Sequence, residues 1–189
     1  MKLSRIKEIL ERNPIISAVK DEKGVEEVIA SESELVFILT SNLFNIKSMV
    51  EKLKEAGKIV FVHADLVDGL SYSTYALEYL VKNTDLDGII STKHSVIKNA
   101  KKMKVMVIQR FFLLDSLSFE NTLKYAKENN PHAVEVLPGL MPKIIRRLAK
   151  ELRVPVIAGG LIGDKEDIMN ALRAGAQGVS TTQKKLWNV

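Results

Sequence analysis

Eight short apolar runs, placed at regular intervals, constrain the fold of this chain more than any other feature. The runs are rich in Val, Ile and Leu and show little polar alternation, which is typical of parallel strands covered on both faces. Their first residues are on average about 23 residues apart, which is near the minimum for a strand followed by a crossover helix. The runs cover 15–19, 35–39, 58–63, 87–91, 105–109, 133–137, 154–158 and 177–180.

The segments between these runs have the charge pattern and period of helices. We expect helices over 46–56 and 164–174, ended by Gly57 and Gly175, since glycine commonly follows the last helical residue. Asp164 is the expected N-cap of the second of these helices. A further helix is expected over 118–129, beginning at Ser118, and an additional amphipathic helix over 1–13.

This alternation predicts an α/β fold, a (β/α)8 TIM barrel with short loops and an extra N-terminal helix. The chain has 189 residues, which is shorter than the roughly 250 typical of such barrels. The alternative is an open, doubly wound sheet. No linker or low-complexity stretch interrupts the pattern, so one domain over 1–189 is expected.

Composition adds limits on class and compartment. Hydrophobic residues make up 46% and charged residues 27% of the chain, which is typical of a globular protein. There is no cysteine, so disulfides and thiolate metal sites are excluded. The charged N-terminus and the lack of a long apolar run predict a cytoplasmic protein that does not interact with membranes. The net charge of +5 permits an anionic partner.

Two neighbouring strand ends carry the residues of an anion site. Gly159 and Gly160 follow the seventh run, and Ser180, Thr181 and Thr182 lie at the end of the eighth. In TIM barrels the loops after strands 7 and 8 commonly bind phosphate, close to a helix N-terminus. We therefore expect backbone N–H groups and hydroxyls here to bind a phosphate-sized anion, with a last helix running to Trp187. The alternative is a tight glycine turn and a simple helix cap at Ser180.

Polar side chains at the other strand ends are expected to form one pocket with this site. Polar groups on apolar strands are costly unless they are paired or bind a ligand. Alternatively, Glu135 forms an ion pair with Lys93 or Arg110 inside the barrel, and His63 is an ordinary histidine at the barrel rim with its hydrogen bonds satisfied. The candidates are Lys20, His63, Asp65, Lys93, Gln109, Arg110 and Glu135.

Four stretches resemble the glycerol uptake operon antiterminators, a family of glycerol-3-phosphate-responsive regulators. They are "VEVLPGLMPKII" at 134–145, "PVIAGGLIGDKEDIMNALRAGAQGVSTT" at 155–182, and the segments 14–71 and 87–118. The resemblance covers nearly the whole chain. It implies a (β/α)8 barrel that senses glycerol 3-phosphate, binds leader mRNA and prevents premature termination at glycerol-use genes. In that case Glu135 or Asp65 would accept hydrogen bonds from the glycerol hydroxyls.

Two basic stripes are candidates for RNA contact. The predicted helix 143–151 presents cations at i, i+3, i+4 and i+7, and a second lysine cluster follows the fourth run. The alternative for each stripe is an ordinary solvated helix face. The segment "RFFLLDSL" at 110–117 would form a subunit interface or a ligand lid if exposed. The stripes consist of Lys143, Arg146, Arg147 and Lys150, and of Lys98, Lys101, Lys102 and Lys104.

A TIM-barrel enzyme acting on a small phosphorylated substrate is the second function class. Lys93 would then form a Schiff base, and His63 with Glu135 would serve as base and acid. No catalytic motif of diagnostic spacing is present. We therefore expect no catalytic residues, no metal and no cofactor apart from glycerol 3-phosphate as an effector. The sequence leaves homo-oligomerisation open.

Overall fold

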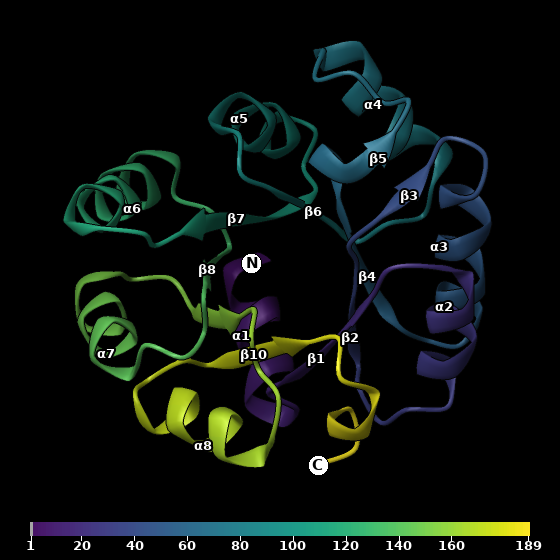
Figure 1. The fold of residues 1–189 in the computed structure, drawn as a ribbon. Helices are drawn as coiled ribbons and strands as arrows, with labels where there is room; N and C mark the ends of the chain where they lie inside the picture. The colour runs from purple at the N-terminus through teal and green to yellow at the C-terminus, as the bar shows by residue number, and fades with distance from the viewer. Residues whose placement is uncertain (1) are drawn as a thin grey trace.

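The computed structural model describes residues 2–189 and contains a closed parallel barrel (Figure 1). Parallel pairing of the first and last barrel strands, with Ile15 opposite Val179 and Ser17 opposite Thr181, closes the ring. The predicted barrel is therefore confirmed, and the open sheet is excluded. In chain order the barrel strands are β1 (Ile15–Val19), β2 (Leu35–Ile38), β4 (Ile59–His63), β6 (Gly88–Ser91), β7 (Met106–Phe112), β8 (Ala133–Leu137), β9 (Val156–Gly159) and β10 (Gly178–Thr181).

Three strand boundaries differ from the predicted ones in a way that affects the site. β7 continues to Phe112, so that Arg110 lies within the strand. β9 ends at Gly159 and β10 at Thr181, and Ser180 pairs with Gly159 across the ladder. Arg110, Gly159 and Thr181 were expected in loops, but ladder hydrogen bonds with the neighbouring strands keep them extended. Their side chains consequently have the fixed alternation of a strand.

Helices surround the barrel and follow its strands (Figure 1). The predicted N-cap at Asp164 is confirmed, because its carboxylate accepts from the backbone N–H of Asp167 at 2.9 Å. The predicted start at Ser118 is wrong: Asp115 is the N-cap and accepts from the Ser118 N–H at 2.8 Å. The helices are α2 (Glu22–Ile29), α3 (Ile46–Glu55), α4 (Thr74–Asn83), α5 (His94–Lys102), α6 (Ser116–Asn129), α7 (Pro142–Glu151) and α8 (Lys165–Arg173).

The segment after β10 forms a single 3-10 turn, η2 (Lys184–Leu186), where a longer helix was expected. The turn folds the chain back so that buried Trp187 donates its indole N–H to the Thr181 carbonyl at 3.0 Å. A turn this short has no N-terminal anion site of its own. The expected contribution of a helix N-terminus to phosphate binding is therefore absent at this position.

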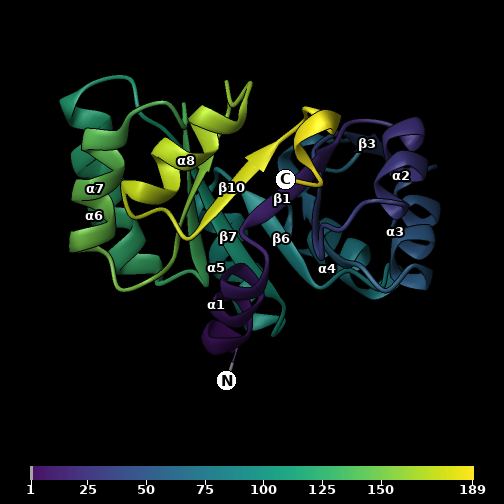
Figure 2. The same ribbon diagram turned by 90° about the horizontal axis from the view of Figure 1, so that it is seen from below.

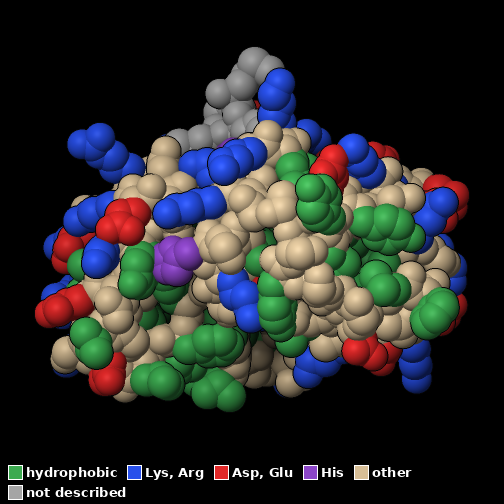
Figure 3. All heavy atoms as spheres, turned by 90° about the horizontal axis from the view of Figure 1, so that it is seen from above, with side chains coloured by type: hydrophobic (Ala, Val, Ile, Leu, Met, Phe, Trp, Pro, Cys, Tyr) green, Lys and Arg blue, Asp and Glu red, His purple; other side chains and the backbone are tan. Residues whose placement is uncertain are grey.

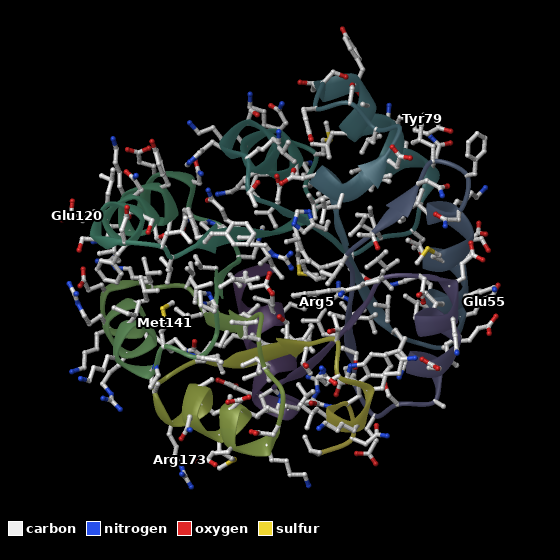
Figure 4. The ribbon with its side chains drawn as sticks, in the orientation of Figure 1. Arg5, Glu55, Tyr79, Glu120, Met141 and Arg173 are labelled. Carbon is white, nitrogen blue, oxygen red and sulfur yellow. The ribbon has the colours of Figure 1, made fainter. Side chains whose placement is uncertain are left out.

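The predicted N-terminal helix is α1 (Lys2–Arg12), which closes the N-terminal end of the barrel (Figure 2). Ile6, Ile9 and Leu10 are buried against inward-facing barrel residues such as Phe37 and Phe61. Arg5 adds an ion pair of 3.6 Å to Asp87 and lies near the centre of the ring in Figure 4. With this end filled by apolar side chains, the opposite, C-terminal end is the one open to a ligand.

Two further clusters of buried side chains fill the layer between barrel and helices, one under α2 to α5 and one under α6 to α8. A small sheet that the sequence did not predict, β3 (Ser41–Asn42) paired with β5 (Val67–Asp68), lies beyond the 3-10 turn η1 (Ala64–Leu66). Within residues 2–189, no helix has the length and apolarity needed to cross a membrane.

Candidate functional site

A buried ion pair lies at the C-terminal end of the barrel. Arg110 of β7 donates from Nε to Glu135 Oε2 of β8 at 2.6 Å, and the Ser180 hydroxyl of β10 donates to Glu135 Oε1 at 2.6 Å. The Glu135 side chain is fully buried, and both of its oxygens are engaged. Of the two partners considered for Glu135 in the alternative of an ion pair, Arg110 is the one found. Ser180 is not a helix cap, because its hydroxyl joins this network.

Gly159 occupies the strand between the two partners of the Ser180–Glu135 hydrogen bond. A Cβ at this position would lie 2.6 Å from both Glu135 Oε1 and Ser180 Oγ. Such contacts are far inside van der Waals distance, so only glycine permits this arrangement. The next residue, Gly160, has φ +74°, a left-handed conformation that favours glycine. The glycine pair thus has two separate causes: close approach of side chains at Gly159, and backbone conformation at Gly160.

Above this network the barrel mouth opens into a cavity of about 240 Å³. Ring closure brings the end of β1 next to the ends of β9 and β10, so that Lys20, Gly160 and Thr181 share one wall. Arg110 also lines the cavity, which therefore has two cations and the neutralising Glu135. The full lining is Ala18, Lys20, Leu39, Arg110, Glu135, Leu137, Gly160, Leu161, Ile162, Ser180, Thr181 and Thr182.

The hydroxyls of Ser180 and Thr181 were expected to donate to an anion, but both are used within the protein. Ser180 donates to Glu135, and Thr181 Oγ1 donates to the Ile162 carbonyl at 3.1 Å. The positive charges of Lys20 and Arg110 are thus the strongest features of the cavity for attracting an anion. The same bonds hold the ends of β8, β9 and β10 in fixed positions around it.

His63 and Asp65 lie outside the residues that line the cavity, contrary to the expectation of one shared pocket. His63, the last residue of β4, is buried and its Nδ1 has no hydrogen-bond partner. Burial and, secondly, the positive charge of Arg110 lower the pKa of His63 to about 4. Asp65 accepts from the Ser91 hydroxyl at 2.6 Å and from the Thr92 backbone N–H at 2.7 Å, so it joins the ends of β4 and β6.

Lys93 and Gln109 also lie away from the cavity lining. The Lys93 ammonium lies 3.3 Å from the ring centroid of Tyr72, which is a cation–π contact. Lys93 is the residue that precedes the first turn of α5. Gln109 alternates with Arg110 along β7 and therefore faces the helix layer, where Asn129 donates to its Oε1 at 2.9 Å. The strand period explains this correction: two consecutive residues of one strand cannot both face the lumen.

Sequence reasoning missed the apolar wall of the cavity. Leu39, Leu137 and Leu161 line it together with the polar residues. Leu161 is 74% exposed and has φ +62°, an uncommon conformation for a side chain of this size. The only available signal was its position directly after the glycine pair. These side chains give the cavity an apolar part beside its cations.

The two basic stripes differ once they are placed in the fold. On α7, Lys143, Arg146, Arg147 and Lys150 are all exposed. On α5, Lys101 donates to the carbonyls of Asn129 and Asn130, each at 2.7 Å, and so anchors the end of α6. The α5 cluster is therefore partly structural, whereas the α7 stripe is available to a partner.

Comparison with known proteins relates this barrel to one family. The model of the family "Glycerol-3-phosphate responsive antiterminator" matches residues 15–187. The Escherichia coli (strain K12) "Uncharacterized protein YgcP" is 41% identical over 181 residues, covering 96% of this chain and 95% of that protein.

Two crystal structures extend this likeness to three dimensions. The glycerol uptake operon antiterminator regulatory protein of Listeria monocytogenes is 34% identical with a TM-score of 0.89, covering 93% of this chain and 95% of that one. The antiterminator-related protein of Thermotoga maritima is also 34% identical, with a TM-score of 0.82 and coverage of 92% and 96%. Orotidine 5′-phosphate decarboxylase from Pyrococcus horikoshii, at 17% identity, shares the fold alone. The residues matched and the shared barrel lead to one conclusion: the chain belongs to the glycerol-3-phosphate responsive antiterminators.

Proposed function

We propose that this protein binds glycerol 3-phosphate in the cavity at the barrel mouth and regulates glycerol-use genes by binding their leader mRNA. The observation that carries the proposal is the meeting of Lys20 and Arg110 around a cavity of about 240 Å³, whose lining also includes Leu39, Leu137 and Leu161. Family membership and the printed family name support glycerol 3-phosphate as the effector. The size of the cavity suits a ligand of that class.

In this proposal the phosphate lies near Lys20 and the Gly160 turn, with Arg110 adding charge-assisted hydrogen bonds. Backbone N–H groups around Gly160, Thr181 and Thr182 complete the anion site. The glycerol hydroxyls lie toward Glu135, and the carbon chain contacts the leucine wall. Gly159, Ser180 and Glu135 hold the geometry of the strands that form the site.

Leader mRNA binds the exposed cations of α7 in this proposal. Lys143, Arg146, Arg147 and Lys150 are the contacts to phosphates, which makes binding strongly dependent on salt. Ligand occupancy in the barrel and RNA occupancy on the helix layer are then two sites of one regulator, coupled by a free energy that is reciprocal.

The residues suggested for an enzyme lie outside the cavity or are engaged in other contacts. Lys93, the candidate for a Schiff base, contacts Tyr72 and does not line the cavity. Both oxygens of Glu135 already accept hydrogen bonds, from Arg110 and Ser180, so this carboxylate has a structural role in the barrel. No specific observation in the cavity favours a reaction over reversible binding.

Calorimetry with glycerol 3-phosphate, glycerol and inorganic phosphate tests the ligand part. We expect glycerol 3-phosphate to bind more tightly than either fragment, since only it combines both groups. A gel-shift titration with glycerol-gene leader RNA, with and without glycerol 3-phosphate, tests the regulatory part. Equal binding of glycerol and glycerol 3-phosphate, or an RNA affinity that the ligand leaves unchanged, would contradict the proposal.

A further inference from the structure

A second, larger hollow lies between α6 and α7, outside the barrel. This α6–α7 groove has a volume of about 420 Å³, with a floor formed by Leu113, Phe119, Met141 and Ile144. Figure 4 places Met141 at the start of α7 and Glu120 on the outer side of α6. An apolar floor of this size is large enough to take a flat, apolar group from a partner.

The groove continues into exposed apolar side chains at the C-terminal face. Leu114 is 85% exposed, Leu117 65% and Phe112 54%; Phe112 ends β7, Leu114 lies in the following loop and Leu117 lies at the start of α6. Figure 3 shows hydrophobic side chains gathered along its lower edge, where this face lies. Adjacent exposed apolar residues of this kind mark interaction sites on globular proteins.

One wall of the groove carries a cation, and further cations lie beside it on the same helix. Arg147 of α7 lines it, with its guanidinium carbon 4.3 Å from the ring centroid of Phe119. Arg146 and Lys150 lie on the exposed side of the same helix. Among the described residues, no carboxylate lies within 4 Å of these cations or of Lys143, whereas Lys47, Lys52, Lys82 and Lys184 each have one. Cations left without counter-charges next to an apolar floor fit a partner that carries both phosphates and flat bases.

The opposite wall carries Asp115 and Glu120 of α6. Carboxylates repel phosphates but accept hydrogen bonds from the amino groups of bases. A strand in the groove therefore has one favourable orientation, with its sugar–phosphate backbone along α7 and its bases directed toward α6. Base pairs of a duplex do not offer free faces to such a floor, so an unpaired strand is required.

A rival surface of aromatic residues lies on the far side of the molecule. Tyr72, Tyr75 and Tyr79 are exposed on and before α4. Glu78 neutralises Lys82 on this helix, and Asp65 and Asp68 lie on the loop that Tyr72 contacts. One cation of this surface, Lys93, is already held on the Tyr72 ring and another, Lys82, is paired, whereas four exposed cations lie on α7. Charge therefore favours the α6–α7 groove.

We propose that the α6–α7 groove binds single-stranded RNA, with unstacked bases on its apolar floor and phosphates on α7. This inference rests on the proposed function, for which it names the RNA surface. The groove is also connected to the ligand cavity: β7 carries Arg110 in the cavity and leads three residues later to Leu113 in the groove. The Leu113 N–H donates to the Leu137 carbonyl of β8 at 2.8 Å, and Leu137 lines the cavity.

Fluorescence anisotropy with a labelled transcript of the leader of a glycerol uptake gene tests the inference. The variant Arg146→Ala/Lys150→Ala removes two exposed cations at i and i+4 of α7, and its matched control Lys98→Ala/Lys102→Ala removes two at the same spacing on α5. We expect the α7 variant to bind about 10-fold more weakly and its log–log salt slope to fall by about 1.4, while the α5 variant stays within twofold of the wild type.

A second pair of variants tests the apolar contact. Leu114→Ala lies in the groove, and the control Phe44→Ala removes another highly exposed apolar side chain elsewhere, 98% exposed against 85% for Leu114. We expect about fivefold weaker RNA binding for Leu114→Ala and none of this loss for the control. Both side chains are exposed, so far-UV circular dichroism and glycerol 3-phosphate affinity should be unchanged in all four variants.

The outcomes separate this inference from the function on which it rests. If the wild type binds the transcript but the α5 or Phe44 variants lose as much affinity as the groove variants, the groove is not the RNA surface and the proposed function stands. If a duplex formed with the complementary strand binds as tightly as the single strand, the inference is likewise overturned. If the wild type binds no transcript at any glycerol 3-phosphate concentration, both fail.

Discussion

The hydroxyl of Ser180 donates to Glu135 Oε1 at 2.6 Å across the strand that separates them. Ser180 belongs to β10 and Glu135 to β8, and the bond passes over Gly159 of β9. It therefore ties three strands together directly beneath the cavity at the barrel mouth. Since Glu135 also accepts from Arg110 of β7, four adjacent strand ends depend on one carboxylate.

Gly159→Ala should destabilise the protein, because its Cβ would collide with both atoms of that hydrogen bond. We expect the free energy of unfolding, measured by chemical denaturation, to fall by about 1–3 kcal/mol. Gly163→Ala is the matched control, since its Cβ would lie no closer than 3.6 Å to a neighbour. Equal stability of the two alanine variants would show that the barrel mouth can relax around Gly159.

Glu135→Gln should lower the free energy of unfolding far more than the same change at an exposed ion pair. It leaves the buried Arg110 guanidinium without a counter-charge, for which we expect a loss of about 3–5 kcal/mol in the free energy of unfolding. The control is Glu34→Gln, whose partner Arg12 lies at 2.6 Å and is largely exposed. There the loss should be no more than about 1 kcal/mol. Similar losses at both sites would mean that water reaches Arg110.

His63 should make the stability depend on pH below neutrality. Because burial lowers its pKa to about 4 in the folded state, the unfolded chain takes up the proton first as the pH falls. The free energy of unfolding should therefore decrease between about pH 6.5 and pH 4, by about 3 kcal/mol from this residue. Asp65 and Arg110 are the charged groups that act on it.

The measurement is a series of denaturation curves for the wild type and His63→Asn over this pH range. The asparagine side chain does not titrate, so the difference between the two stability profiles isolates the histidine. A wild-type profile parallel to that of the variant would contradict the lowered pKa.

Trp187 should report ligand binding through its fluorescence. It is the single tryptophan of the chain, and its indole N–H donates to the carbonyl of Thr181, which lines the cavity. We expect glycerol 3-phosphate to change the intensity or wavelength of its emission, with a midpoint that matches the calorimetric affinity. Glycerol at the same concentrations is the control. Calorimetric binding without any change in emission would place the ligand away from Thr181.

Much of the fold could be predicted from local sequence patterns. The eight apolar runs with helices between them predicted the barrel, because strands buried on both faces and amphipathic helices have different periods. Asp164 was identified as an N-cap by its chemistry alone, whereas α6 was placed two residues late because Asp115 and Ser118 both have capping side chains. Local propensity cannot decide between two such neighbours without the turn that precedes them.

Which polar side chains pair at the candidate site was harder to predict from the sequence. The residue types at the strand ends indicated an anion site, and Lys20, Arg110, Glu135, Gly160, Ser180 and Thr181 do meet at one cavity. The strand boundaries were too imprecise to tell which consecutive residue faces the lumen, so Gln109 was placed in the pocket beside Arg110. A shift of one residue moves a strand side chain to the opposite face of the sheet. Even a small error in a strand boundary therefore changes which residues are predicted to face the lumen.

The sequence by itself determined that eight strands alternate with helices, that glycines and hydroxyls come together at the last two strand ends, and that cations repeat along α7. Only the tertiary structure decided that Glu135 bridges Arg110 and Ser180, that Lys93 and Gln109 turn away, and that a groove opens beside α7. The physical reason is that periodicity and propensity act between residues close in the chain. Which polar atoms meet depends instead on ring closure and strand register, which join residues as far apart as Lys20 and Thr181.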